Sequence, residues 1–587
     1  MLNCERIIIA GDRITAATIS SRLGTWGTYI PVLDPPRPKR LDFDTEVLRR
    51  INLLKLARST TVVQAGLPGD IITALNRYLS PSQVEVVDIA DAERYQRGSY
   101  EPREVLTTSP SSVLAGLYCA LRQNRVLSIR DGAKSVEPDN AFPSNHIVVV
   151  EDHEAVGSVA AVNYAALVGA HLAVVPARTR VESDRIIFQL RQFDDAKNGL
   201  DREDIANDLV TQLAERVRRL ELARYSTCTF FTSGFPLSPA ATGLSVAHIS
   251  VYPDCGLTVL RNLLFHNPIR TALIVDPMHL PDTETAALRR HLESQSVYVR
   301  VLRGDEASVT DVDFHLGQLP YDLIYLAVHG GYPQGARLRV EFLDENGKEH
   351  ILVILKADSF SVIPNSDKVH VASFYEFESL DGIPWSSPNR GWAGNLNHMI
   401  QHFNECILDG TAKIVSSETG IPMKYCNSVR LADDNYYLHF NNVGSIEGAI
   451  LINNACCSSL QLADLALFGG VNQYVGTTYS VLNPIAQRFA VSTLQSGKSM
   501  CRSVSEYNES SATSYGLPCY AYYGLPERRI TYCQADNKDY YCSRVTDQLV
   551  RTEKYKRDNP FHHLMDRVDM NLIRLRQEIR RVRGNKL

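Results

Sequence analysis

Histidine and cysteine, the two residue types that together activate a thiol, occur in this sequence where two apolar runs end. The run DLIYLAV (322–328) stops at His329, which is followed by Gly330. The run GAILINNA (448–455) stops at Cys456. Loops at the ends of parallel strands are where α/β proteins usually hold their functional groups. If both runs are strands of one sheet, the imidazole and the thiol are expected at the same edge.

A histidine and a cysteine so placed can carry out nucleophilic catalysis at a carbonyl. The thiolate is the nucleophile, and an adjacent imidazole can hold the thiol deprotonated or accept its proton during attack. Gly330 lets the backbone approach a substrate without a Cβ in the way. Exposed N–H groups at Gly330 and Cys456 would point at a developing oxyanion. The sequence therefore predicts His329 and Cys456 as a catalytic dyad, with Gly330 and Cys456 as oxyanion donors.

The elements around these residues follow the alternation of an α/β fold, in which short apolar runs are separated by helix-like stretches. In the C-terminal half, strands are predicted at 271–276, 297–302, 322–328, 448–455, 473–479 and 519–524. A long interruption at about 335–445 begins with a hairpin whose turn is Asn346-Gly347, and it is predicted to be an insertion, either a lid or a partner surface.

The first 231 residues show the same alternation, with runs such as RIIIAG, TVVQAG, HIVVVED and CTFFTSG. They are predicted to form a separate N-terminal α/β domain. The stretch TSGFPLSPAATG (232–243), rich in Gly, Pro and Ser, predicts a linker. A second domain is then predicted at 244–530, and a C-terminal extension at 531–587.

The composition limits the classes of function. The net charge of −5 gives no global attraction to nucleic acid or to an anionic membrane. The twelve cysteines include no CxxC pair and no matching histidine spacing, so neither a zinc site nor a disulfide framework is signalled, and no cofactor is predicted. No run approaches the length of a membrane span, and the N-terminal apolar run is too short for a secretory signal, so we expect a cytoplasmic protein.

With these motifs in view, residues 245–530 closely resemble the CHAT domain, a caspase-like cysteine peptidase family related to separases, gingipains and caspases. The resemblance covers about half of the chain. It rests on an ordered set of segments: ALIVDP, DLIYLAVHGG, LINNACCSS, GGVNQYVGTTYSVLNPIAQRFAVSTLQSGKS and YAYYGLP.

The resemblance implies a caspase-like, mostly parallel sheet flanked by helices. It places the family's catalytic histidine on His329 and its nucleophile on Cys456, which directly follows Ala455. It implies an endopeptidase that cleaves a protein substrate, typically a prokaryotic effector of antiviral defence that a partner or signal activates. The chain departs from the family at Cys457, which is either a bystander or a redox partner of the nucleophile, and at Tyr479, where a tryptophan is common.

Substrate specificity is less readable. In caspase-like folds the residue two before the nucleophile often lines the pocket for the side chain that precedes the scissile bond, and here it is Asn454. A neutral amide offers no ion pair to Arg or Lys. Asp464 is either the source of a negative charge in that pocket or a solvated helix residue, so cleavage after a basic residue stays an open alternative.

The C-terminal segment from Pro560 predicts an amphipathic helix. Its apolar stripe consists of Leu564, Val568, Leu572, Leu575, Ile579 and Val582, and its basic face of Arg574, Arg576, Arg580, Arg581 and Arg583. The stripe is expected to dock on the body, with the basic face in solvent; contact of that face with nucleic acid is the alternative. For the whole chain, the alternative to a peptidase is an inert CHAT-like sensor or scaffold whose N-terminal domain binds a ligand or partner.

Overall fold

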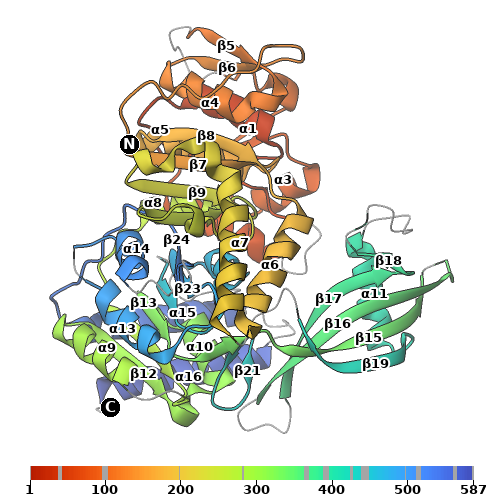
Figure 1. The fold of residues 1–587 in the computed structure, drawn as a ribbon, viewed down its shortest axis with the longest axis vertical. Helices are drawn as coiled ribbons and strands as arrows, with labels where there is room; N and C mark the ends of the chain where they lie inside the picture. The colour runs from red at the N-terminus through yellow and green to blue at the C-terminus, as the bar shows by residue number, and fades with distance from the viewer. Residues whose placement is uncertain are drawn as a thin grey trace.

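The computed structural model of the chain describes residues 2–37, 43–95, 103–196, 198–279, 283–344, 346–362, 369–385, 387, 396–423, 428–437, 448–459, 461–495, 497–510, 517–558 and 565–584. The fold is α/β, as predicted, and is organised around a ten-stranded, mostly parallel sheet (Figure 1). Its strand order is β12-β11-β13-β22-β23-β24-β10-β9-β7-β8. Helices pack on both faces of this sheet.

The first 129 residues form a small α/β layer with two sheets of its own, which lies at the top of Figure 1 and shares a hydrophobic core with α5 and α8. The larger sheet has four parallel strands in the order β2-β1-β3-β4, and β5 pairs with β6. The elements of this layer are β1 (Arg6–Ala10), α1 (Arg13–Leu23), β2 (Val32–Leu33), α2 (Phe43–Leu56), β3 (Thr61–Ala65), α3 (Gly69–Asn76), β4 (Val84–Val87), β5 (Val105–Thr108), α4 (Val113–Arg122) and β6 (Val126–Ile129).

A buried charge cluster ties this layer to the rest of the molecule. Arg50 on α2 is fully buried and donates to Asp254, to the Asp34 carbonyl (2.7 Å) and to the Glu46 carbonyl (3.0 Å). Arg37 pairs with both Glu46 (2.7 Å) and Asp254 (3.3 Å). Buried charges are tolerated when they are paired in this way. The cluster therefore joins residues 34–37 and α2 to the loop that carries Asp254.

Asp34 in this cluster predicts a pH-dependent stability. Burial, together with the neighbouring Asp254 carboxylate, raises the pKa of Asp34 to about 7, and its Oδ2 has no hydrogen-bond partner among the residues that the structure describes. A carboxyl whose pKa is raised by folding stabilises the native state below its unfolded pKa, near 4, and loses that contribution as pH rises through 7. We expect Asp34→Asn to exceed the wild type in unfolding free energy at pH 8 by on the order of 2 kcal/mol, and to match it near pH 4.

Urea denaturation across this pH range measures the difference. Asp44→Asn, at an exposed position of the same region, is the matched control and should follow the wild-type pH profile. An Asp34→Asn curve parallel to that of the wild type at every pH would contradict the assignment.

The ten-stranded sheet crosses the predicted boundary at 232–243. β9 and β10 on either side of that segment are neighbours in parallel register, with Thr227 opposite Ser245. Phe235 and Leu237 within the segment are buried, so it is a packed connection and not a free linker. The elements of this part are β7 (His146–Asp152), α5 (Gly157–Val168), β8 (His171–Pro176), α6 (Arg180–Asp195), α7 (Gly199–Val217), β9 (Thr227–Thr232), β10 (Ser245–Ser250) and α8 (Cys255–Leu264).

The C-terminal half of the sheet contains the predicted strands and helices. Each of the six predicted strands is confirmed within a few residues. The elements are β11 (Thr271–Asp276), α9 (Thr283–Ser294), β12 (Tyr298–Arg303), α10 (Val309–Gln318), β13 (Leu323–Leu326), β22 (Ile450–Asn453), α12 (Gln461–Gly469), β23 (Gln473–Thr477), α13 (Asn483–Thr493), α14 (Met500–Ser510) and β24 (Tyr520–Tyr523).

The two halves of the sheet share one connectivity. From the outer edge inward, the first half reads β8-β7-β9-β10 and the second reads β12-β11-β13-β22, so each reads second, first, third, fourth strand in chain order. All of these neighbours are parallel. The halves meet at β24, which is antiparallel to β23 and parallel to β10, so they run in opposite directions.

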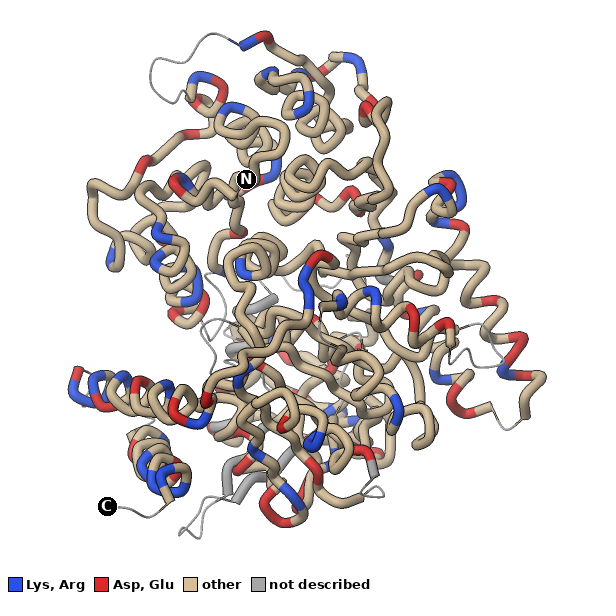
Figure 2. Tube along the Cα trace, turned by 90° about the vertical axis from the view of Figure 1, so that its left-hand side faces the viewer, with Lys and Arg blue, Asp and Glu red and all other residues tan. Residues whose placement is uncertain are grey.

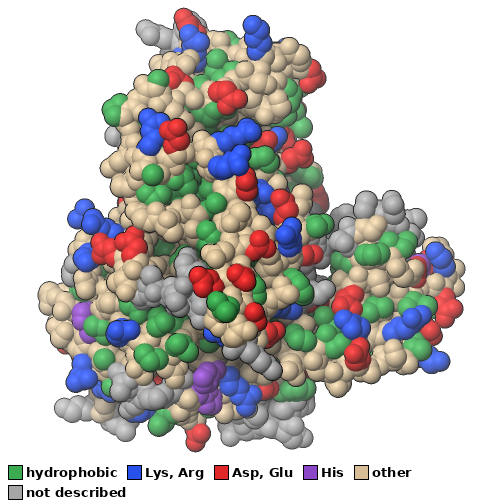
Figure 3. All heavy atoms as spheres, viewed as in Figure 1, with side chains coloured by type: hydrophobic (Ala, Val, Ile, Leu, Met, Phe, Trp, Pro, Cys, Tyr) green, Lys and Arg blue, Asp and Glu red, His purple; other side chains and the backbone are tan. Residues whose placement is uncertain are grey.

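The predicted insertion forms a five-stranded antiparallel sheet that stands apart from the body at the right of Figures 1 and 3. The hairpin at Asn346-Gly347 is confirmed, with Leu343 opposite Glu349 and Gly347 at a positive φ of 77°. Acidic and basic side chains mix on the visible face of this sheet (Figure 3). This sheet consists of β15 (Gln334–Leu343), β16 (Glu349–Val362), β17 (Val369–Leu380), β18 (Ile383–Pro384) and β19 (Lys413–Pro422), and α11 (Leu396–Leu408) packs on it. A separate three-stranded sheet is formed by β14 (His329–Gly331), β20 (Ser428–Arg430) and β21 (Asn435–Tyr436).

The C-terminal extension consists of α15 (Asn537–Asp558) and α16 (Met565–Arg583); the predicted helix start at 560–564 lies outside the described residues. Leu572, Leu575 and Val582 are buried against the body, as predicted. Three arginines of the basic face form ion pairs with acidic residues of the same chain. The pairs are Arg574 with Asp311, Arg576 with Glu553, and Arg581 with Glu578. Figure 2 shows acidic and basic residues interspersed along α15, the helix that precedes the C-terminal one.

Candidate active site

The two strands that precede His329 and Cys456 are neighbours in the ten-stranded sheet. β13 and β22 pair in parallel, with Leu326 opposite Asn453, and the Asn454 N–H donates to the Leu326 carbonyl (3.0 Å). The carboxyl ends of parallel neighbours lie at one edge, so the chain emerges from both strands at the same place. This is the arrangement that the sequence predicts.

Gly330 packs directly against the residues at the end of β22. A Cβ placed on Gly330 would lie 2.6 Å from the Ala455 Cβ and 2.9 Å from the Cys456 carbonyl oxygen. Contacts this short are possible only for glycine. The backbone of the His329 strand therefore lies against the backbone of Cys456, and the two residues predicted as oxyanion donors are adjacent.

Cys456 occupies a tightly pinned turn. The Thr477 hydroxyl donates to the Ala455 carbonyl (2.6 Å), and the Ser458 hydroxyl donates to the Asn453 carbonyl (2.7 Å). Cys456 itself is half-buried, and its Sγ lies 4.0 Å from the Val481 carbonyl oxygen. A thiol held on a rigid turn and open to solvent suits a nucleophile.

His329 is exposed and belongs to β14, where it lies opposite Arg430 of β20. Its ring stacks on His279, with centroids 6.0 Å apart and an interplanar angle of 26°. The His279 Nε2 lies 3.2 Å from the Leu431 carbonyl, to which it donates. His279 follows β11 at the same edge of the sheet; its place after a predicted strand was the available sequence signal, and it was overlooked.

The His329 ring and the Cys456 thiol are both described, and no hydrogen bond joins them in this conformation. The thiol is directed at Val481 instead. Catalytic hydrogen bonds are often long or misaligned without substrate and tighten only in the complex. The structure therefore brings the two residues to one edge of the sheet, with the thiol in contact with the Val481 carbonyl and not bonded to the imidazole.

Cys457 is more deeply buried than its neighbour Cys456. It is buried and donates to Asp194 Oδ2 (3.0 Å). Burial, reinforced by the Asp194 carboxylate, raises the pKa of the Cys457 thiol well above its usual value. A protonated, buried thiol is a poor nucleophile, which favours the bystander interpretation over a redox role.

The two residues considered for a specificity pocket do not line an open one. Asn454 is buried and bonded to Glu284 Oε1 (2.6 Å), Tyr325 (2.8 Å) and Tyr520 (2.5 Å). Burial raises the pKa of Glu284, whose contact with Asn454 the sequence did not reveal. Asn454 therefore supports the turn from beneath.

Asp464 on α12 is half-buried. Burial raises its pKa to about 7, against the opposing effect of a hydrogen bond from the Ser250 hydroxyl at the end of β10. Its side chain thus faces the other half of the sheet and not Cys456.

A second cysteine and histidine lie close together on α11, where Cys406 Sγ is 3.5 Å from His402 Nε2. This nitrogen also lies 2.8 Å from the Leu343 carbonyl, so it carries the proton and cannot act as a base toward the thiol. Cys406 is buried. The pair is therefore structural.

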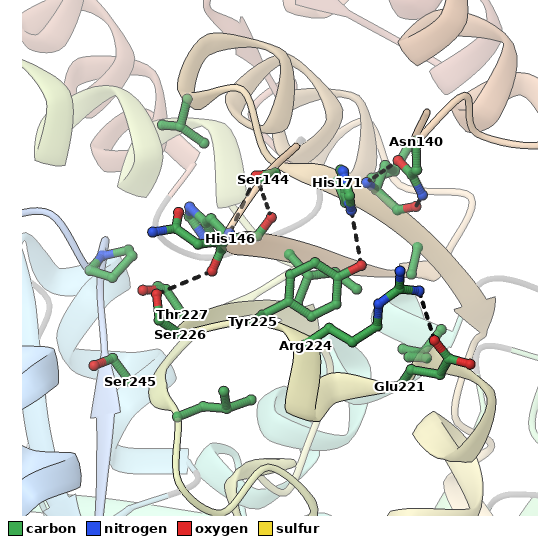
Figure 4. Close-up of a pocket in the computed structure, with 18 of the residues that line it drawn as sticks. Asn140, Ser144, His146, His171, Glu221, Arg224, Tyr225, Ser226, Thr227 and Ser245 are labelled. Atoms are coloured by element: carbon green, nitrogen blue, oxygen red, sulfur yellow. Dashed lines mark hydrogen bonds and ion pairs between the residues drawn. The ribbon is translucent and has the colours of Figure 1, made fainter. Parts of the chain in front are cut away.

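The N-terminal part holds a cavity of about 1600 Å³. It is lined by the starts of β7, β8, β9 and β10 and by residues 219–225, which follow α7 (Figure 4). His146 donates to or accepts from Thr229 (2.9 Å), and burial lowers the His146 pKa to about 4. His171 bonds to the Tyr225 hydroxyl (2.9 Å). The lining of this cavity is polar and carries charges of both signs, and residues of α14 and Glu527 from the C-terminal half contribute to it. Such a lining suits a polar ligand or a peptide segment.

Within the described residues, no group of three or more His, Cys, Asp or Glu side chains is placed to hold a metal ion. None of the described helices has the length and apolar character needed to cross a membrane.

Comparison with protein-family models and with curated proteins finds no match. Among solved structures, the chain is similar to Cwp6 from Clostridium difficile, with 11% sequence identity and a TM-score of 0.24. The alignment covers 59% of this chain and 62% of that one, so this chain spans less than two thirds of that protein's length. A likeness this weak carries no argument about function.

Proposed function

We propose that this protein is a cysteine endopeptidase in which Cys456 is the nucleophile and His329 the general base. The observation that carries the proposal is the packing of Gly330 against Ala455 and Cys456 at one edge of the sheet. It brings the strand that contains His329 (the histidine strand) next to the turn that contains Cys456 (the cysteine turn). The resemblance of the sequence to CHAT domains supports it independently. The mostly parallel sheet with helices on both faces is the architecture that this resemblance implies.

In the proposed reaction, the His329 imidazole accepts the proton of the Cys456 thiol as Sγ attacks the scissile carbonyl. The N–H groups of Gly330 and Cys456 donate to the oxyanion. The imidazolium then protonates the leaving amine, and water hydrolyses the thioester. From the resemblance, the substrate is a protein and the enzyme a cytoplasmic effector of prokaryotic defence, activated by a partner or a signal.

We expect a peptidyl electrophile, such as an acyloxymethyl ketone, to label Cys456. In His329→Ala the labelling rate should fall about 10²-fold to 10⁴-fold, because the general base is lost. His402→Ala is the matched control, since it removes the histidine of the structural pair on α11 and should leave labelling unchanged. Peptide mass spectrometry identifies the labelled thiol.

A Cys456 labelling rate that is the same in the wild type and in His329→Ala, or labelling of other thiols alone, would instead support an inert sensor or scaffold. The observation that favours this second function is the cavity in the N-terminal part.

A further inference from the structure

The last turn of α6 belongs to the N-terminal part of the chain, yet it touches the loops around the candidate site. Arg191 donates to the Met423 carbonyl at the end of β19. Its guanidinium also lies over the Tyr332 ring, 4.1 Å from the centroid, three residues after His329. The same helical turn therefore contacts both the insertion and the segment that follows the histidine.

Two further residues of this turn hold the loop after β23. Phe193 packs edge-on against Tyr479, with ring centroids 5.1 Å apart. Asp194 accepts from the Ser480 N–H through Oδ1 and from the Cys457 thiol through Oδ2, both at 3.0 Å. One carboxylate thus joins the turn beside the nucleophile to the loop that faces it.

This contact offsets two local costs. Asp194 lies in the last turn of a helix, where the macrodipole disfavours a negative charge. Cys457 adopts a φ of 55°, in the left-handed region that a residue with a Cβ rarely occupies. Asp194 and Cys457 thus each adopt a locally unfavourable arrangement, and they bond to each other. This combination indicates a functional constraint and not chance packing.

The contact also determines where the nucleophile points. Val481 directly follows Ser480, and its carbonyl is the group that Cys456 Sγ faces at 4.0 Å. By fixing Ser480, Asp194 holds that carbonyl beside the thiol, which makes no hydrogen bond to His329 in this conformation.

We propose that the C-terminal turn of α6, through Asp194, is an autoinhibitory latch on the catalytic loops. Its release lets the loop after β23 move, and the Cys456 thiol then turns from the Val481 carbonyl to the His329 imidazole. This inference rests on the proposed peptidase function and adds to it the place where the N-terminal part controls the site.

Alkylation of Cys456 by iodoacetamide in the full-length protein tests the latch, because it reports thiol release without requiring a substrate. Asp194→Ala should raise the alkylation rate about tenfold or more, since the closed population no longer dominates. Asp195→Ala, at the exposed neighbouring position of the same turn, should stay within about twofold of the wild type. Peptide mass spectrometry separates Cys456 from the other thiols.

The outcomes distinguish the two proposals. An unchanged or lower rate at Cys456 in Asp194→Ala overturns the latch, whatever His329 does. A raised rate that His329→Ala leaves unaltered in the Asp194→Ala background supports the latch but overturns the dyad. If the alanine variant fails to fold, Asp194→Asn can replace it, because asparagine keeps the side-chain volume and one hydrogen-bond acceptor. The alkylation rate of Asp194→Asn should lie between those of the wild type and Asp194→Ala. A rate equal to that of the wild type would overturn the latch.

Discussion

Replacing Gly330 by alanine is expected to reduce the reaction of Cys456 with a peptidyl electrophile about 10²-fold, the effect of displacing reacting groups by about 1 Å. The new Cβ would lie 2.6 Å from the Ala455 Cβ and 2.9 Å from the Cys456 carbonyl. Both neighbours are fixed by the strand and turn that carry them, so the histidine strand must move away. The oxyanion donors separate in the same movement.

Gly331 provides the matched control, since a Cβ there meets nothing within 4 Å and its φ is outside the left-handed region. Gly331→Ala should retain reactivity within about twofold. Circular dichroism and thermal unfolding establish that both variants are folded. Equal reactivity of the two variants would show that the contact between Gly330 and Cys456 has no part in catalysis.

Replacing Arg50 by methionine is expected to lower the unfolding free energy by about 3 kcal/mol, because removal of one partner strands a buried charge. Arg50 is fully buried and Asp254 is 3% exposed. Methionine preserves the aliphatic volume of the arginine, so the loss reports charge and hydrogen bonding. Chemical denaturation measures it, and Lys55→Met, at an exposed position of the same helix, should change stability by less than about 0.5 kcal/mol.

The double variant Arg50→Met with Asp254→Asn isolates the pair. Among the described residues, the Asp254 carboxylate in Arg50→Met keeps only its longer ion pair with Arg37 (3.3 Å). Removing this carboxylate should restore part of the stability, so the double variant should be less destabilised than the sum of the single ones. Strict additivity would mean that Arg50 acts through its backbone acceptors alone.

The alternation of apolar runs was enough to predict most of the strands, because β11, β13, β22 and β23 are buried on both faces and read as continuous apolar segments. The hairpin at Asn346-Gly347 was predictable because its turn needs a positive φ. The continuity of the sheet across residues 232–243 was not predictable. Gly, Pro and Ser residues indicate a turn, but they do not indicate whether the strands on either side of it pair. The shared connectivity of the two halves left no repeat of fixed period in the sequence.

Part of the candidate site was predictable because the strands that lead to it were predictable. His329 and Cys456 follow predicted strands, and parallel pairing alone brings strand ends together. His279 follows a predicted strand in the same way and could have been included. Asp194 reaches the site from the end of a helix whose position is set by tertiary packing, which no local pattern encodes. The Asn454 side chain lies on the buried side of the chain where β22 ends, and it bonds to Glu284. Its role in supporting the turn could therefore be recognised only in the structure.

The pairing of β9 with β10 bears on how the protein can be dissected. A chain begun at residue 244 would keep β10 but lose its parallel neighbour β9, so the alternate N–H and C=O groups of Ser245–Ser250 that face β9 would have no partner. Such an open border recruits other chains and promotes aggregation. It would also lack α6 and everything that this helix holds in place. The smallest fragment that can carry the cysteine in its native surroundings must therefore begin before β7.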